Sequence, residues 1–126
     1  MAGLSAADKA AILNAHLCGG TYTGEASLYI GLHTGDPGDW GVANELSYTS
    51  YERQPITFLA ADATGTVNSA DVTFAVTDAE VGTVTHYSIH SAATGSAFRH
   101  SGLLTGGTLD SGEIPTIKAG ALAITI

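Results

Sequence analysis

Hydrophobic and polar residues alternate along residues 28–33, and this is the clearest pattern in the chain. Leu28, Ile30 and Leu32 fall on one side of an extended backbone, and the residues between them fall on the other. A period of two is typical of a β-strand, because successive side chains point to opposite faces of a sheet. The segment therefore predicts a strand whose aliphatic face lies in a core.

Similar short runs of β-branched and aromatic residues follow, separated by turns that contain glycine and aspartate. The connections between them are too short for the helical crossovers that parallel strands need. We therefore predict an all-β fold, an antiparallel β-sandwich or jelly roll. The further strands are expected at 51–58, 71–76, 83–89, 97–104 and 122–126, with two shorter ones at 64–69 and 108–114.

One short N-terminal helix is predicted over residues 5–18. Ser5 is a suitable N-cap, Asp8 stands three residues later as in a short-armed capping box, and Gly19 and Gly20 end the helix. Its apolar stripe is too thin to hold the helix alone, so we expect it to pack on its own sheet or on a neighbouring subunit. The stripe consists of Leu4, Ala11, Ile12 and Ala15.

A single domain is expected from the length of 126 residues, because two domains would each have too small a core. Residues 1–20 form the N-terminal arm and helix in this division, and residues 21–126 form the sandwich. Hydrophobic residues make up 44% of the chain and charged residues only 13%, which favours a packed globule. A surface so poor in long charged side chains also favours a lasting protein partner.

The net charge of −8 argues against direct nucleic-acid binding and against an anionic membrane surface. The four cations are scattered along the chain and form no basic cluster. Cys18 is the only cysteine, so no intrachain disulfide is possible. We see no secretion signal and no apolar run near the roughly 18 residues of a membrane span. The cations are Lys9, Arg53, Arg99 and Lys118.

Histidines in the predicted strands raise the question of a metal site. His86 and His90 would lie on one face of a strand but roughly 13 Å apart, too far to share an ion. We therefore expect no metal and no cofactor, and we interpret the strand histidines as surface or partly buried side chains. They are His33, His86, His90 and His100.

Acidic residues are numerous, but a structural role in turns explains them more simply than catalysis or metal binding does. Asp36 and Asp39 flank Pro37-Gly38 and suit a turn better than a calcium loop, whose alternating carboxylates are missing. No nucleophile elbow, phosphate-binding loop or dinucleotide fingerprint is present. Paired carboxylates for glycoside cleavage stay open as an alternative. The expectation is a protein that is not an enzyme, with no catalytic residue.

Aromatic residues in and beside the loop at 35–51 are the best candidates for a contact surface. Trp and Tyr bury a large area with few rotatable bonds, so they suit protein interfaces and sugar-binding platforms alike. Trp40 is equally well explained as a side chain that closes one end of the sandwich core. The candidate interface residues are Trp40, Tyr48, Tyr51, Leu4 and Ile12.

Several segments, taken in order, resemble a family of small structural proteins of tailed bacteriophages. Each motif alone is weak, but together they cover nearly the whole chain. The segments are Leu28-Tyr-Ile-Gly-Leu-His-Thr-Gly-Asp-Pro-Gly38, Asn44-Glu45, Tyr51-Glu-Arg53, Val67-Asn-Ser-Ala-Asp-Val-Thr-Phe74, Gly82-Thr-Val-Thr-His86 and Ala119-Gly-Ala-Leu-Ala-Ile-Thr-Ile126.

The resemblance implies a virion component. Some relatives are similar to jelly-roll cement proteins, so the expected function is a capsid decoration protein that bridges major capsid proteins and neighbouring virion subunits. Such a protein would be a homo-oligomer, a dimer or trimer, on the capsid surface after assembly in the host cytoplasm. Other relatives are labelled tail-fibre proteins, which makes an adsorption domain that binds host-surface glycans the alternative.

Overall fold

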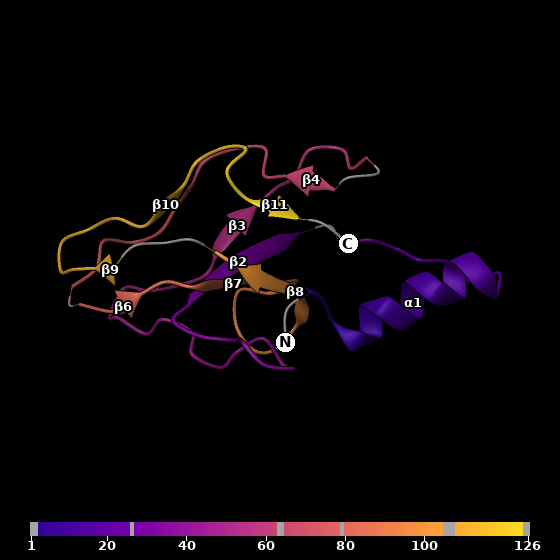
Figure 1. Cartoon of the computed structure of the whole chain (residues 1–126), viewed down its shortest axis with the longest axis horizontal. Helices are drawn as coiled ribbons and strands as arrows, with labels where there is room; N and C mark the ends of the chain where they lie inside the picture. Colours follow the sequence, from indigo (N-terminus) through magenta and orange to yellow (C-terminus); the bar gives the residue numbers. More distant parts are fainter. Residues whose placement is uncertain (1–2, 26, 63–64, 79, 105–107, 125–126) are drawn as a thin grey trace.

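A five-stranded antiparallel sheet forms the centre of the computed structural model, which describes residues 3–25, 27–62, 65–78, 80–104 and 108–124. Its strands lie in the order β1-β8-β7-β2-β3 (Figure 1). The middle strand, β7, pairs along five residues with each of its neighbours. The strands span Gly3–Leu4 (β1), Phe98–Leu103 (β8), His86–His90 (β7), Leu28–His33 (β2) and Gln54–Ile56 (β3).

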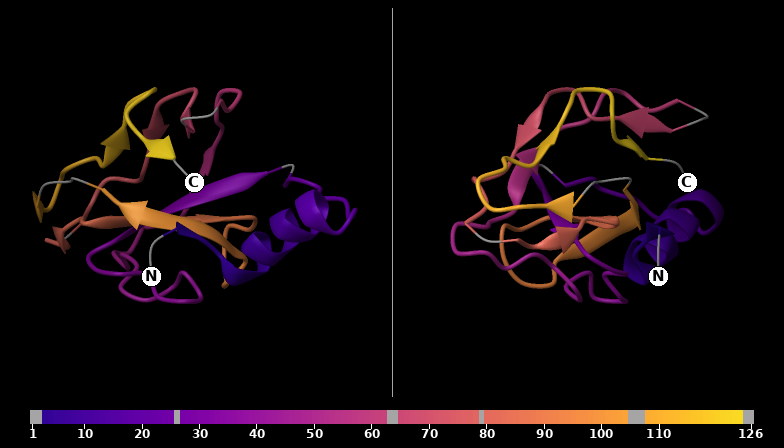
Figure 2. Two further views of the ribbon diagram at one scale, coloured as in Figure 1. Left: turned by 45° about the vertical axis from the view of Figure 1, so that its right-hand side comes forward. Right: turned by 60° about the vertical axis from the view of Figure 1, so that its left-hand side comes forward.

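Six shorter strands form three antiparallel pairs outside this sheet. The yellow C-terminal strands and the pink strands that pair with them lie over one face of the central sheet (Figure 2). This arrangement confirms the predicted all-β antiparallel sandwich, with a second layer built from separate ribbons. The pairs are Thr66–Val67 (β4) with Ala123–Ile124 (β11), Val72–Thr73 (β5) with Thr116–Ile117 (β10), and Gly82–Thr83 (β6) with Thr108–Leu109 (β9).

The apolar core contains side chains from both layers. Ile30 and Leu32 of β2 and Tyr87 and Ile89 of β7 are each at most 3% exposed. Because side chains alternate along a strand, the residues between them face the opposite side of the sheet. β3 of the same sheet contributes Ile56. The second layer and the connecting segments contribute Leu46, Tyr48, Val72, Phe74, Val84, Ile117 and Leu122.

Helix α1, Ala6–Leu17, is the one helix of the described chain and extends to one side of the sheet (Figure 1). The predicted cap is confirmed, since the Ser5 hydroxyl accepts a hydrogen bond from the Asp8 amide at 3.2 Å. Gly19 has a φ of +70°, and the Gly20 amide donates to the Asn14 carbonyl, which ends the helix. No strand packs extensively against α1 in the described part of the chain.

Some elements differ from the sequence-based expectation. The strands expected at 51–58 and 71–76 shrink to β3 and β5, and the strand expected at 83–89 divides into β6 and β7. Two-residue strands β1 and β10 were not predicted, since so short a segment shows no alternation. Within the predicted segments, residues 64 and 125–126 lie outside the described residues.

Candidate binding site at Trp40

The loop at 34–47, which we name the Trp40 loop, is held in shape by its own turn residues. Asp36 accepts a hydrogen bond from the Gly38 amide at 2.8 Å, as expected of a turn. The Asn44 side chain donates to the Asp36 carbonyl at 3.0 Å, and the Ala43 amide donates to Pro37 at 2.9 Å. The loop is therefore an ordered platform.

Gly41 brings this loop into close contact with the central sheet. Its φ is +72°, and a Cβ atom there would lie 2.3 Å from Phe98 Cδ1 and 3.0 Å from His90 Cε1. Only glycine fits so close an approach. The neighbouring Trp40 side chain is 71% exposed, so the loop presents its indole to solvent.

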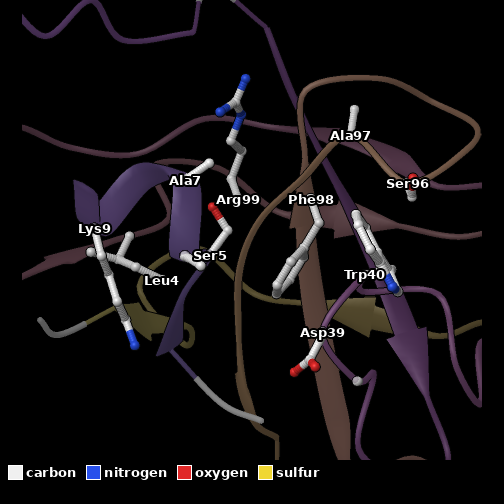
Figure 3. A pocket seen from close by; sticks show the side chains of 12 residues that line it. Leu4, Ser5, Ala7, Lys9, Asp39, Trp40, Ser96, Ala97, Phe98 and Arg99 are labelled. Atoms are coloured by element: carbon white, nitrogen blue, oxygen red, sulfur yellow. The ribbon is translucent and has the colours of Figure 1, made fainter. Parts of the chain in front are cut away.

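Beside Trp40 lies a surface cavity of about 610 Å³, which we name the Trp40 recess. It lies between the Trp40 loop, the start of β8 and the segment from β1 into α1 (Figure 3). Trp40 and Phe98 lie on one side of it and Leu4 on the other. The lining residues are Leu4, Ser5, Ala6, Ala7, Lys9, Gly38, Asp39, Trp40, Ser96, Ala97, Phe98 and Arg99.

A β-bulge positions two of these lining residues. The pairing of β7 with β8 shifts register after Ile89, so that His90 lies opposite Phe98 and Arg99 is the extra residue. Arg99 donates to Asp8 of α1 at 3.0 Å and also binds Glu25. Its charge is thereby balanced, and the side chains of Lys9 and Asp39 supply the remaining charges of the recess, one of each sign.

Beneath the Trp40 loop, three fully buried side chains form a hydrogen-bonded chain. Ser88 Oγ lies 2.7 Å from His33 Nε2 and 2.8 Å from His90 Nε2, and all three residues are 0% exposed. His33 Nδ1 lies 2.7 Å from the carbonyl oxygen of Ala43 in the loop. The expectation of surface or partly buried histidines is therefore wrong for His33 and His90, because the loop covers this face of the sheet.

An ion pair fills the same side of the sheet. Arg53 donates to both carboxylate oxygens of Glu45, at 2.9 and 3.0 Å, and Tyr51 donates to Glu45 at 2.6 Å. Burial raises the pKa of Glu45, but the hydrogen bonds from Arg53 and Tyr51 outweigh it and hold this pKa below its usual value. A Cβ at Gly31 would lie 2.7 Å from Glu45 Oε2, so the glycine makes room for the carboxylate.

The serine and histidines do not form an accessible catalytic centre. A serine beside a histidine is the arrangement of a nucleophile and its base, but Ser88 and both rings are sealed from solvent. Nor do three His, Cys, Asp or Glu side chains converge on a metal-binding geometry anywhere in the described residues. What this arrangement provides is a fixed support for the loop above it.

The structure brings together only two of the predicted interface residues. Trp40 and Leu4 line the recess, and Ile12 is half-buried on α1 outside it. Tyr48 is 8% exposed and donates to the Ala75 carbonyl, while Tyr51 packs against the core. The two tyrosines therefore form no common surface with Trp40.

The recess also contains residues that the sequence analysis did not single out. Phe98 lines it, and Ser88 supports it from below through His90, while Asp39, interpreted from the sequence as a turn residue, also lies in the lining. Phe98 lies near the start of the strand predicted at 97–104, but which face it occupies depends on the bulge at Arg99, for which the sequence carries no signal.

Comparisons with known proteins agree with a virion role. Among the described residues, no helix has the length and apolar character that a membrane crossing needs. A comparison with curated proteins finds no match to this chain. A family model described as "Podophage GP4 fiber I protein gp80" matches residues 3–125, which is nearly the whole chain. The chain therefore belongs to the podophage GP4 fiber I protein gp80 family and is a structural protein of a bacteriophage virion.

Proposed function

We propose that this virion protein is a fibre component and that the Trp40 recess binds a saccharide of the host cell surface. The observation that carries the proposal is Trp40, 71% exposed beside a cavity of about 610 Å³. An exposed indole offers an apolar face to the C–H side of a sugar ring. Asp39 and Lys9 supply an acceptor and a donor for sugar hydroxyls.

We also infer that the chain acts by binding and not by catalysis. Supporting this, the serine with two histidine partners lies in a sealed interior, where no substrate reaches it. The fibre description of the family favours a fibre over the capsid shell, which the sequence resemblance put first. A capsid decoration protein is thus the alternative that imaging must test.

Trp40→Ala is expected to lower binding of purified protein to its glycan at least about tenfold, because central aromatic residues carry much of the affinity of a contact. A glycan array identifies the ligand, and titration calorimetry measures the affinities. Leu103→Ala is the matched control, since Leu103 is 77% exposed on β8 and is not a lining residue. Equal affinities for the Trp40 variant and the unaltered protein would reject the saccharide site.

The position on the particle is tested separately by electron microscopy of virions. The proposal predicts density for this chain on a fibre. Density confined to the capsid shell would contradict the fibre role and favour the decoration protein, whatever the glycan array shows.

Exposed leucines on α1 favour a second contact, with a neighbouring virion subunit. Leu13 and Leu17 are 57% and 77% exposed and lie four residues apart, on one side of the helix. The described strands cover little of α1. A helix of 12 residues is marginal in water without packing, so a protein partner for this side is the natural source of support.

Replacing both Leu13 and Leu17 with serine is expected to reduce incorporation into virions severalfold, while the free energy of unfolding of the isolated chain changes by less than about 1 kcal/mol. Quantitative mass spectrometry of purified particles and chemical denaturation measure the two effects. The control replaces Asn14 and His16 with serine in the same turns. Normal incorporation of the leucine variant would show that α1 is not the contact.

A further inference from the structure

The hydrogen-bond partners of the buried histidines define which ring nitrogen carries the proton. His33 Nδ1 faces the Ala43 carbonyl, which only accepts, so this nitrogen is the donor and Nε2 of the neutral ring accepts from Ser88. Ser88 Oγ then accepts from His90 Nε2. His90 Nδ1 is left as a buried nitrogen with no hydrogen bond of normal geometry.

The donors and acceptors of this chain are matched when both rings are neutral, and the Ser88 hydroxyl can donate to His33 Nε2 only if that nitrogen carries no proton. A proton on His33 Nε2 would set an N–H group against the hydroxyl hydrogen of Ser88, and a proton on His90 Nδ1 would bury a charge beside Gly41. Burying an unpaired charge costs far more than exposing it. Proton uptake therefore favours any conformation in which the rings reach water.

We propose that His33, Ser88 and His90 form a clamp that holds the Trp40 loop on the sheet in the neutral state and releases it on acidification. The proposal rests on the proposed function only in naming the Trp40 recess as the site that is controlled. The clamp itself follows from the contacts of Ala43 and Gly41 with the two rings.

The loop is the part of the structure that yields. His33 and His90 lie on β2 and β7, whose backbones pair along five residues, so the sheet side of the clamp is rigid. On the other side, the loop rests on the rings through Ala43 and Gly41 and carries the exposed Trp40 beside them. Freeing the rings requires that the part of the loop from Gly38 to Ala43 move outward, while Glu45 stays paired with Arg53.

Burial keeps both rings neutral at ordinary pH. Burial lowers the pKa of His90 to about 4 and also lowers the pKa of His33. Arg53 acts in the same direction, whereas Glu45 and the backbone groups of Ala43 and Gly41 raise the two pKa values without offsetting the effect of burial. From the neighbouring strands, His86 lies opposite His33 and Tyr29 opposite His90, while Phe98 and Ser101 of β8 carry no charge.

The sign of the pH dependence follows from these shifts. A free histidine has a pKa near 6.5, whereas His90 in the closed clamp has one of about 4. The opened loop therefore binds protons that the closed loop does not, and it gains population as the pH falls from 6.5 toward 4. Above pH 6.5 both states are neutral and the closed loop is fully favoured.

The experiment uses the one tryptophan of the chain as a local probe. The full chain is prepared with 5-fluorotryptophan, and the ¹⁹F resonance and fluorescence anisotropy of Trp40 are recorded from pH 8 to pH 3, with far-ultraviolet circular dichroism on the same samples. We expect the Trp40 signals to change with a midpoint between pH 6.5 and pH 4, while the dichroism stays native. Nitrogen-detected titration of the histidine rings in the unaltered protein identifies the groups that take up protons.

Two matched variants test whether His90 is responsible for the change in the Trp40 signals. His90→Gln keeps a donor near the Nε2 position but does not titrate, so its Trp40 transition is expected to move down by about one pH unit or more. His16→Gln removes an exposed histidine from α1 and is expected to leave the profile unchanged.

Two results would overturn the clamp. In one, the Trp40 signals change only together with the loss of dichroism, so that the loop moves only when the whole chain unfolds. In the other, the ring titration of the unaltered protein shows His33 and His90 still neutral after Trp40 has changed, a result that needs no variant to fold. Neither measurement uses a glycan, so a failed saccharide site and a failed clamp are told apart.

Discussion

Replacing Arg53 with methionine is expected to lower the free energy of unfolding by about 3–5 kcal/mol, because it leaves the Glu45 carboxylate buried without its cation. The Arg53 side chain is only 4% exposed and that of Glu45 17%. Methionine keeps most of the aliphatic length, so the loss reports the charge more than the volume. Chemical denaturation at neutral pH, analysed as a two-state transition, measures the change.

The matched control for this variant is Lys118→Met. Lys118 pairs with Asp71 at 3.6 Å, but the two side chains are 76% and 53% exposed. An exposed pair contributes little, so the expected loss is below about 1 kcal/mol. Adding Glu45→Gln to Arg53→Met should restore part of the stability, since the stranded charge is removed. Similar losses of unfolding free energy for Arg53→Met and Lys118→Met would contradict the buried ion pair between Arg53 and Glu45.

Phe74→Ala is the second large effect, with an expected loss of about 3 kcal/mol or more from the cavity it leaves. Phe74 is 2% exposed, and its ring stacks on that of Tyr51 with centroids 6.1 Å apart. Thermal and denaturant unfolding both measure the loss.

The comparison for Phe74 is Val76→Ala, two residues further along the same segment. Val76 is 48% exposed, so its truncation is expected to change the free energy of unfolding by less than about 1 kcal/mol. A loss below about 1 kcal/mol for Phe74→Ala would mean that Phe74 does not lie between the two layers.

Elements with a strong local signal are the ones that the sequence predicts well. β2 has strict alternation, and α1 has a capping serine and a pair of glycines, so both have nearly the predicted bounds. The second layer has strands of two residues that depend on partners far along the chain, as where Thr66 and Val67 pair with Ile124 and Ala123. No local pattern encodes such pairings, so β4, β5, β9 and β11 were predicted too long and β10 was not predicted.

The site was harder to predict than the fold, because residue type does not fix exposure. Trp40, Tyr48 and Tyr51 are close in sequence, yet only Trp40 faces solvent, since Gly41 turns the loop against the sheet. The contact between His33 and Ser88 joins residues 55 positions apart. Its one trace in the sequence is Gly31, which leaves the polar side of a core strand without a side chain.

The Arg99–Asp8 ion pair fixes helix α1 near its N-terminal end, so a small rotation there becomes a larger displacement at the other end. From Asp8 to Leu17 the helix runs about 14 Å at 1.5 Å per residue, so a rotation of about 10° at the ion pair moves the tip by roughly 2 Å. The direction of that tip is determined where α1 meets β8, at a bulge that also places Phe98 in the Trp40 recess. Changes at one short stretch of β8 would therefore alter the position of the helix tip and the shape of the recess together.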